Sequence, residues 1–360
     1  MMRAALALAR RSLGRTWPNP AVGCVIVRDG RVIARGRTQE GGRPHAEAQA
    51  IAHAGESLSG ATVYVTLEPC SHHGRTPPCA DALVAAGVAR VVSALEDPDP
   101  RVRGQGHARL RQAGIAVEVG EGGAEAAAIN AGFLLRVKEG RPLFHLKIAS
   151  SLDGRIATAA GESKWITGEA ARADGQRLRA THDAILIGLG TAQADDPDLT
   201  CRLPGLGARS PLRVVLDSQA RLAPTSKLAA TARQVPVWLL CTEAAPVVRR
   251  EALHKAGVEI VDVTVGDDGR VDIAEAARVL GARGLTRVLV EGGGQVAASF
   301  VRAGLVDRVS SYRAGLVVGG DGRSAVAELG FNRLDFAPRF RLESARSVGG
   351  DTLETWTRET

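Results

Sequence analysis

The sequence predicts an α/β protein of two domains, and three features of the chain support this prediction. Its 360 residues exceed the roughly 150 residues of an average domain. Short apolar strand patterns alternate with helical patterns twice along the chain, which favours parallel sheets covered by helices. The helix-breaking segment Glu139-Gly140-Arg141-Pro142 separates the two runs. We therefore predict domains over residues 1–141 and 142–360.

The first domain is predicted to begin with a helix at residues 1–13. This segment is rich in Arg, Ala and Leu, as targeting helices are, but it runs into Trp17-Pro18-Asn19-Pro20 without a cleavage-type site. A hairpin follows, because two strand patterns flank the turn residues Asp29-Gly30. The remaining elements alternate between strands and helices. We expect strands at 22–28, 31–38, 61–67, 90–95 and 115–119, and helices at 45–54, 79–86, from 106 onward, and at 124–138.

The second domain is predicted to restart the alternation with a strand at 143–150. Further strands are expected at 184–189, 212–217, 235–241, 258–263 and 286–291, and helices at 169–181, 247–256, 273–282 and 295–303. Strand patterns without intervening helices then follow at 307–318, 340–346 and 352–357. We expect these last strands to be antiparallel and to close one edge of the sheet.

Charge and cysteine content exclude several classes of protein. The net charge is +7, but arginines are scattered along helices and aromatic residues make up 3% of the chain, so a concentrated nucleic-acid surface is not expected. Phosphorylated small molecules are the favoured partners. No stretch approaches 18 consecutive apolar residues, so we expect no membrane span. Five cysteines, an odd number, argue against a disulfide framework and favour a cytoplasmic, reducing location. Cys24, Cys201 and Cys241 are expected to pack in the core.

One imidazole, two thiols and a spare carboxylate form the most informative pattern in the chain. His45-Ala46-Glu47 precedes Pro69-Cys70 and Cys79. A catalytic zinc site takes three protein ligands and leaves a fourth position open. Zinc deaminases of nucleobases use one His and two Cys for the metal and a Glu for proton transfer. We therefore predict that His45, Cys70 and Cys79 bind zinc and that Glu47 is the catalytic acid and base.

A structural zinc site is the alternative interpretation of these residues. Such a site would usually add a fourth protein ligand, and His72 or His73 could serve. A fourth ligand would leave Glu47 without a role, so we favour the catalytic interpretation.

A second candidate site lies at the glycine-rich segment Glu291-Gly292-Gly293-Gly294-Gln295, between a predicted strand and a predicted helix. Glycines there let backbone N–H groups approach an anion at the helix start. A simple strand-to-helix turn would use the same glycines. The segment lacks the Gly-x-Gly-x-x-Gly fingerprint of Rossmann domains. Predicted loops around 150–155, 161–167 and 194–202 place polar residues next to strand ends, where open α/β sheets bind ligands.

These motifs resemble those of the bifunctional riboflavin-biosynthesis family, a diaminohydroxyphosphoribosylaminopyrimidine deaminase fused to a 5-amino-6-(5-phosphoribosylamino)uracil reductase. The eight residues between Cys70 and Cys79 are typical of this family, whereas tRNA and cytidine deaminases have two. The resemblance covers nearly the whole chain. It rests on Pro18-Asn19-Pro20-x-Val22-Gly23-Cys24, His45-Ala46-Glu47, residues 66–79, Ser151-Leu152-Asp153-Gly154, Trp165-Ile166-Thr167, Ala194-Asp195-Asp196-Pro197 and Asp217-Ser218.

The resemblance implies a cytidine-deaminase-like α/β/α sandwich followed by a dihydrofolate-reductase-like α/β domain that uses NADPH. It also implies a phosphorylated pyrimidine substrate and a homo-oligomer, a dimer or a tetramer. The residues that it assigns to NADP are Ala149, Trp165, Thr191, Asp195, Ser218, Gly293, Gly294 and Gln295. Those that it assigns to the substrate are Ser163, Arg179, Leu199, Arg202 and Glu291.

Some assignments within the second domain stay open. Arg179 and Arg202 suit a phosphate, because a guanidinium can donate two hydrogen bonds to its oxygens. Lys147 or Asp195 could supply the proton that accompanies hydride transfer, although Lys147 could equally be a salt-bridge residue. The family usually carries Ala-Pro-Lys near Ala314-Gly315-Leu316, and Asp99 stands where Asn is common. The first departure affects the expected reductase pocket and the second the expected deaminase substrate contacts.

Two other functions remain compatible with the sequence. One is a nucleoside or tRNA deaminase with an appended nucleotide-binding domain, which would need a basic groove and a pocket for an extruded base. The other is a degenerate reductase domain that binds NADPH as a sensor without consuming it.

Overall fold

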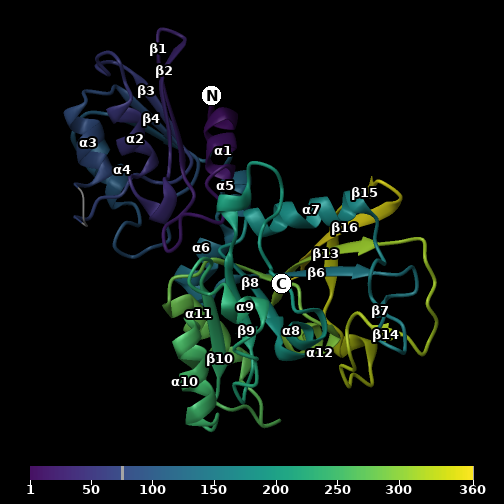
Figure 1. Cartoon of the computed structure of the whole chain (residues 1–360). Coiled ribbons are helices and arrows are strands. Elements are labelled where there is room, and N and C mark those ends of the chain that lie inside the picture. Colours follow the sequence, from purple (N-terminus) through teal and green to yellow (C-terminus); the bar gives the residue numbers. More distant parts are fainter. Residues whose placement is uncertain (74–76, 360) are drawn as a thin grey trace. The chain divides into compact units, whose positions relative to one another are not determined.

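The chain folds into two compact units, Met1–Gly140 and Arg141–Thr360, in a computed structural model that describes residues 1–73 and 77–359 (Figure 1). Gly74, Arg75 and Thr76, which belong to the motif at 66–79, lie outside the described residues. No helix of the described part is both long and apolar enough to span a bilayer.

The N-terminal unit is built on a five-stranded sheet with the order β2-β1-β3-β4-β5. The predicted hairpin is present and turns at Asp29-Gly30, where both residues have positive φ, as a tight hairpin turn requires. β1 pairs antiparallel with β2 and with β3, whereas β3, β4 and β5 are parallel. The parallel arrangement predicted for this domain therefore holds for its second half only. The strands are β1 (Gly23–Arg28), β2 (Arg31–Arg37), β3 (Thr62–Val65), β4 (Arg90–Ser93) and β5 (Ala116–Val119).

Helices cover both faces of this sheet because successive side chains of a strand point to opposite sides. Cys24 and Ile26 of β1 pack in one core with residues of α2, α3, α4 and α6. Val25 packs in the other core with α1 and α5. The result is an α/β/α sandwich. Its helices are α1 (Met2–Arg10), α2 (Ala46–Ala52), α3 (Cys79–Ala85), α4 (Gln105–Gln112), α5 (Gly123–Ile129) and α6 (Ala131–Glu139), with a 3₁₀ turn at Glu40–Gly42.

The single helix predicted at 124–138 is wrong, because Asn130 divides it into α5 and α6. The buried Asn130 side chain accepts a hydrogen bond from the Ala21 N–H at 2.8 Å and donates one to the Ala21 carbonyl at 3.1 Å. Asparagine amides readily bind backbone groups in this way and compete with a continuous helix.

The C-terminal unit contains a nine-stranded sheet with the order β11-β10-β9-β8-β12-β6-β13-β16-β15. All pairs from β11 to β13 are parallel, and β16 and β15 are added antiparallel at one edge. The three late strands are antiparallel to one another, as predicted, because β13 pairs antiparallel with β16 and β16 with β15. β13 also joins this edge to the parallel part of the sheet, since it is parallel to β6. The strands are β6 (Leu143–Ser150), β8 (Ala184–Gly188), β9 (Leu212–Leu216), β10 (Val237–Cys241), β11 (Glu259–Asp262), β12 (Arg287–Val290), β13 (Val306–Arg313), β15 (Phe340–Val348) and β16 (Asp351–Arg358).

Several short elements of this unit have no clear pattern in the sequence. α8 contains Gly190 and lacks a regular apolar repeat, and its last two residues fall in the loop predicted around 194–202. Thr191 and Asp195 consequently lie on a helix. The short ribbon of β7 (Arg155–Ala157) and β14 (Arg323–Ser324) was also missed. The helices are α7 (Glu169–Ala180), α8 (Leu189–Asp195), α9 (Lys227–Ala230), α10 (Val247–Ala256), α11 (Ile273–Ala282) and α12 (Gly294–Arg302), with 3₁₀ turns at Gly207–Arg209 and Leu334–Phe336.

A chain of buried hydrogen bonds connects α7, β6 and β13. Nδ1 of His182 lies 2.6 Å from the Leu178 carbonyl and must carry a hydrogen, because a carbonyl can only accept. In a neutral ring, Nε2 of His182 then accepts from Nδ1 of His145 at 3.1 Å. Nε2 of His145 accepts in turn from the Ser310 hydroxyl at 2.9 Å. Each hydrogen in this series of hydrogen bonds therefore has one position that satisfies every donor and acceptor.

Both histidines are held in the neutral state. Burial, with the cationic Arg287 nearby, lowers the pKa of His182 to about 3. Burial also lowers the pKa of His145 well below its ordinary value. Protonation of either ring would break the chain and leave a charge in the core.

We predict that acid destabilises the C-terminal unit through these two histidines. The unfolded rings bind protons below a pKa of about 6.5, whereas the folded rings do not. Stability is therefore fully present above about pH 6.5 and decreases as the pH falls toward about 3, by at most about 1.4 kcal/mol per pH unit for each ring. Urea denaturation at a series of pH values would measure this slope. His182→Gln should reduce it, while the same change at the exposed His254 of α10 should not. An equal slope in both variants would contradict the prediction.

Candidate metal centre and cofactor pocket

Three separate segments of the N-terminal unit bring one imidazole and two sulfurs together. His45 is the N-cap of α2, Cys70 lies in the loop after β3, and Cys79 is the first residue of α3. Nδ1 of His45 lies 3.6 Å from Sγ of Cys70 and 3.4 Å from Sγ of Cys79. Tetrahedral zinc, with its usual bond lengths, separates a nitrogen and a sulfur ligand by about 3.5 Å. The described donors therefore fit a zinc ion.

The backbone favours the charged form of one thiol. The N–H of Cys79, at the start of α3, donates to Sγ of Cys70 at 3.3 Å. Hydrogen bonding from Cys79 lowers the pKa of the Cys70 thiol, although burial opposes this effect. A thiolate is the form that binds zinc.

Glu47 lies next to this donor group and is not part of it. Its carboxyl is in the first turn of α2 and is 4% exposed. Burial raises the pKa of Glu47 to about 7, although the neighbouring His45 opposes the shift. A carboxyl group in this setting can both accept and return a proton near neutral pH.

The donor group has three members among the described residues. His45, Cys70 and Cys79 place their ligand atoms within 4.8 Å of one another, and neither His72 nor His73 joins them. The fourth ligand that a structural zinc site requires is thus not found in the described part of the chain. This geometry favours a site with an open position.

The loop that carries Cys70 is held by Glu68, a residue that the sequence analysis did not single out. The carboxylate of Glu68 is buried and accepts four backbone N–H bonds, at 2.9 to 3.2 Å. The donors are Asp97, Gly104, Gly106 and His107. A Cβ atom at Gly106 would lie 1.9 Å from the Pro69 carbonyl, so α4 can approach the cysteine loop only with glycine there. In the sequence, only Gly104 and Gly106 indicated a close approach of backbone at this point.

A second grouping of possible metal ligands, Glu68, Glu96 and His107, includes the same carboxylate. The oxygens of Glu68 already accept the four N–H bonds, so we assign this group a structural role.

We predict that Cys79→Ser strongly reduces the zinc content of the purified protein, because it removes one of three ligands. Atomic absorption on metal-saturated and then dialysed protein would measure the zinc-to-chain ratio. Cys241→Ser is the matched control, since Cys241 is a buried free thiol of β10. Equal zinc content in both variants would contradict the assignment of Cys79.

The C-terminal unit contains a cavity of about 1180 Å³ at the carboxyl ends of β6, β8 and β12. This volume exceeds the usual range for ligand pockets, which leaves room for a dinucleotide and a substrate together. All the residues predicted to contact NADP or substrate line this cavity except Ser218. Ser218 follows β9, and its hydroxyl accepts a hydrogen bond from the Val271 N–H at 2.9 Å. The lining members are Ala149, Ser163, Trp165, Arg179, Thr191, Asp195, Leu199, Arg202, Glu291, Gly293, Gly294 and Gln295.

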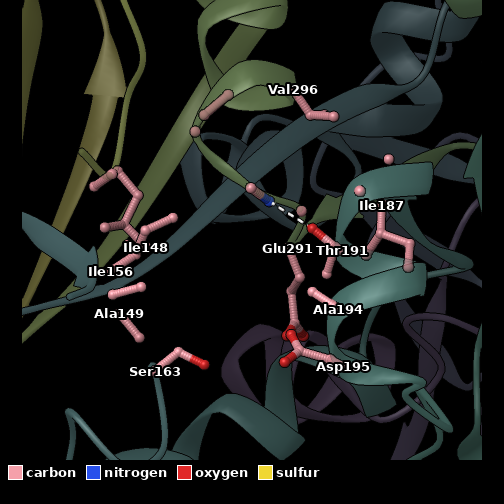
Figure 2. A pocket seen from close by; sticks show the side chains of 18 of the residues that line it. Ile148, Ala149, Ile156, Ser163, Ile187, Thr191, Ala194, Asp195, Glu291 and Val296 are labelled. Atoms are coloured by element: carbon pink, nitrogen blue, oxygen red, sulfur yellow. Dashed lines mark hydrogen bonds between the residues drawn. The ribbon is translucent and has the colours of Figure 1, made fainter. Parts of the chain in front are cut away.

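The glycine-rich segment turns from β12 into α12 at the wall of this cavity. The Gly293 N–H donates to the hydroxyl of Thr191 at 3.1 Å, and Figure 2 shows this bond as the dashed line that ends at Thr191. A Cβ atom at Gly292 would lie 2.7 Å from Cα of Ile187, and one at Gly294 would lie 2.5 Å from the Ser324 carbonyl. Close packing thus explains Gly292 and Gly294 without a ligand. A simple strand-to-helix turn would need these glycines for the same reason. The start of α12 also lines the cavity, where its N–H groups suit an anion.

A buried ion cluster lies in the cavity wall. Arg179 donates two hydrogen bonds to Glu291, both at 2.9 Å, and Nζ of Lys147 lies 3.7 Å from the same carboxylate. Burial alone would raise the pKa of Glu291, but Arg179 and Lys147 lower it to about 2. Arg179 also donates to the Thr200 carbonyl, so its guanidinium is already engaged. Arg202 has a more exposed side chain and lies 3.9 Å from Asp198.

Two further cationic residues of the cavity were missed in the sequence. Arg172 places its guanidinium 4.5 Å from the centre of the Trp165 ring, and Lys164 lies 3.9 Å from Asp195. Arg172 and Arg179 are seven residues apart on α7, which puts both on one helix face. This spacing is the signal that could have identified Arg172.

The two sites define the class of protein. An imidazole and two thiols beside a free buried carboxylate, on an α/β/α sandwich, are typical of a zinc-dependent deaminase. A large cavity at the carboxyl ends of parallel strands, with a glycine-rich helix start, is typical of a nucleotide-dependent enzyme.

Comparison with known proteins identifies the family. Residues 1–95 match the cytidine and deoxycytidylate deaminase zinc-binding region, and residues 142–353 match the RibD C-terminal domain. The riboflavin biosynthesis protein RibD of Escherichia coli (strain K12) is 43% identical, over 97% of this chain and 96% of its own length. The chain belongs to the RibD family of bifunctional riboflavin-biosynthesis enzymes, which join a zinc-dependent deaminase to an NADPH-dependent reductase.

Solved structures of the family confirm the predicted fold class. Acinetobacter baumannii RibD, form 1, is 39% identical, with a TM-score of 0.89 over 100% of this chain and 98% of that chain. A diaminohydroxyphosphoribosylaminopyrimidine deaminase/5-amino-6-(5-phosphoribosylamino)uracil reductase from Thermotoga maritima is 35% identical, with a TM-score of 0.86 over 99% of this chain and 97% of that chain.

Proposed function

We propose that the two units catalyse consecutive steps on one phosphorylated pyrimidine. The N-terminal unit hydrolyses the 2-amino group of 2,5-diamino-6-(5-phosphoribosylamino)pyrimidin-4(3H)-one, so that water is consumed and ammonia is released. The C-terminal unit reduces the ribosyl side chain of the product to ribityl. The observation that carries the proposal is the placement of Glu47 beside, but outside, the group of His45, Cys70 and Cys79.

In the deaminase reaction, the three donor residues hold the metal and Glu47 moves protons. Zinc at this position supplies a nucleophile from water at neutral pH. Glu47 takes up one proton from the attacking water and passes it to the ring nitrogen. It then moves the second proton, from the hydroxyl of the adduct, to the amine, which leaves as ammonia. Its burial keeps the carboxyl near the pKa that this exchange needs.

We predict that Glu47→Gln abolishes ammonia release while zinc stays bound and reduction continues. The amide keeps the shape of the side chain but cannot carry the proton. Ammonia release, zinc content and NADPH oxidation with the deaminated substrate would be measured on the same preparation. Unchanged ammonia release would refute the role of Glu47, and joint loss of zinc and ammonia release would point to a structural role instead.

In the reductase reaction, the cavity binds the cofactor and the deaminated pyrimidine side by side. NADPH supplies the hydride to C1′ of the ribosyl group. The start of α12 and the Thr191 hydroxyl define one wall, and Trp165 with Arg172 defines another. Lys147 and Asp195 both line the cavity and remain the candidates for the accompanying proton. The ion pair with Glu291 keeps Lys147 in place.

We predict that Thr191→Val weakens NADPH binding by about threefold to tenfold, because the Gly293 N–H loses its partner and the glycine-rich turn loses its position. A titration of cofactor fluorescence would measure the dissociation constant. Thr181→Val is the matched control, since Thr181 caps the end of α7 and does not line the cavity. Equal affinities in the two variants would contradict the prediction.

Two assays separate this function from its alternatives. Ammonia release without NADPH, followed by NADPH oxidation on the product, supports the bifunctional enzyme. A nucleoside or tRNA deaminase would instead act on those substrates, with salt-dependent RNA binding in the second case. A sensor would bind NADPH without oxidising it.

The proposal extends to the setting in which the enzyme works. We assign it to the cytoplasm, as a homo-oligomer (a dimer or a tetramer) that acts on a small phosphorylated pyrimidine and not on nucleic acid. None of the five cysteines is in a disulfide, which suits a reducing compartment. Exposed apolar side chains beside the outer strand β15, Leu334 and Phe336 among them, are compatible with subunit contacts.

A further inference from the structure

An arginine without exposed surface binds a segment that lines the reductase cavity. Arg213 is in β9, between β8 and β10 in the sheet, and is fully buried. Its Nη1 donates to the Asp198 carbonyl at 3.2 Å and to the Thr231 hydroxyl at 2.8 Å. Its Nη2 donates to the carbonyls of Thr231, at 3.1 Å, and Val235. No ion pair of Arg213 occurs within the described ranges 1–73 and 77–359.

The acceptor Asp198 belongs to a segment that forms part of the cavity wall. Residues 195–199 all line the cavity, whereas Arg213 does not. Asp196 and Leu199 have φ angles of 38° and 57°, in the left-handed region that non-glycine residues rarely adopt. Such a backbone persists only where surrounding contacts hold it.

Separate contacts hold the two ends of this segment. The carboxylate of Asp196 accepts the N–H of Lys227 at 2.8 Å. The Thr200 carbonyl accepts from Arg179 at 3.1 Å. Between these points, the Arg213 guanidinium donates to the Asp198 carbonyl.

The chemistry of this site requires an arginine. A planar guanidinium can reach four acceptors along two directions, whereas a lysine ammonium has three donors at one point. Burial lowers the pKa of Arg213 to about 10, so the group is charged at neutral pH. The hydrogen-bond acceptors of this buried charge are all neutral, and the Asp198 carboxylate attracts it only from a distance. Such a charge is costly, and well-packed apolar residues would stabilise a core better. A contribution to folding stability alone therefore does not explain why an arginine occupies position 213.

We propose that Arg213 is a positioning residue of the reductase, which fixes residues 195–199 so that Asp195 and Leu199 meet the cofactor and the substrate. The proposal rests on the reductase function proposed above. Arg213 acts through the backbone of Asp198 and touches neither ligand.

The test compares Arg213→Lys with Arg287→Lys in the full chain. Arg287 is also a buried arginine, but it begins β12, at the end of the strand away from the cavity. We expect Arg213→Lys to raise the KM of the reductase step about tenfold or more, with a smaller change in kcat, because misplaced binding residues weaken ligand contacts. Arg287→Lys should lower stability without changing KM. Ammonia release by the N-terminal unit serves as the internal control for both variants.

Hydrogen exchange of the amides at 195–200 provides a second readout, and Arg213→Gln provides a second variant if the lysine variant does not fold. Faster exchange confined to this segment, together with the raised KM, supports the proposal. Unchanged KM and exchange with lower stability would overturn it and leave Arg213 a purely structural residue. Failure of the proposed function is distinguishable, because the unaltered chain would then bind NADPH without oxidising it. In that case weaker NADPH binding by Arg213→Lys would still support the positioning role, and equal binding would overturn it.

Discussion

The N-terminal unit depends on bringing one imidazole and two sulfurs, from three separate segments, within reach of a single ion. The starts of α2 and α3 place His45 and Cys79, and the loop after β3 places Cys70. That loop is held in turn by the Glu68 carboxylate, through four backbone N–H groups. A carboxylate that accepts from the backbone fixes the loop more firmly than side-chain contacts on a surface could. The arrangement of the three donor atoms therefore depends on the packing of the whole α/β/α sandwich.

In the C-terminal unit, buried charged side chains hold the wall of the cavity in place. Arg179, Lys147 and Glu291 form a cluster in the cavity wall, and Arg213 binds the backbone behind another part of it. In both places a cation that cannot leave the protein interior holds polar groups in one arrangement. Rigid placement of this kind lets a site bind its ligands without first ordering its own side chains.

The sequence predicted the type of most elements, and it predicted as one group His45, Cys70 and Cys79, which the structure places together. Periodic apolar patterns and motif spacing are local properties of the sequence. Sequence-based prediction failed where contacts between distant segments determine the local structure. Asn130 breaks a helix because it binds Ala21, more than a hundred residues earlier in the chain. Glu68 and Arg213 have no local pattern at all, since their partners belong to other segments and are mostly backbone groups. Ser218 follows a strand end and accepts from the Val271 N–H instead of lining the cavity, and its contact with NADP stays a prediction.

The outermost strand β15 has consequences for how copies of the chain associate. Its residues 341–347 are exposed, and one side of its backbone has no strand partner in the nine-stranded sheet. Pairing with the same strand of a second copy across a twofold axis would cap the sheet, whereas any head-to-tail pairing would leave a new free edge and grow into fibres. Arg341, Glu343 and Arg346 put charge along this edge, which disfavours open-ended growth.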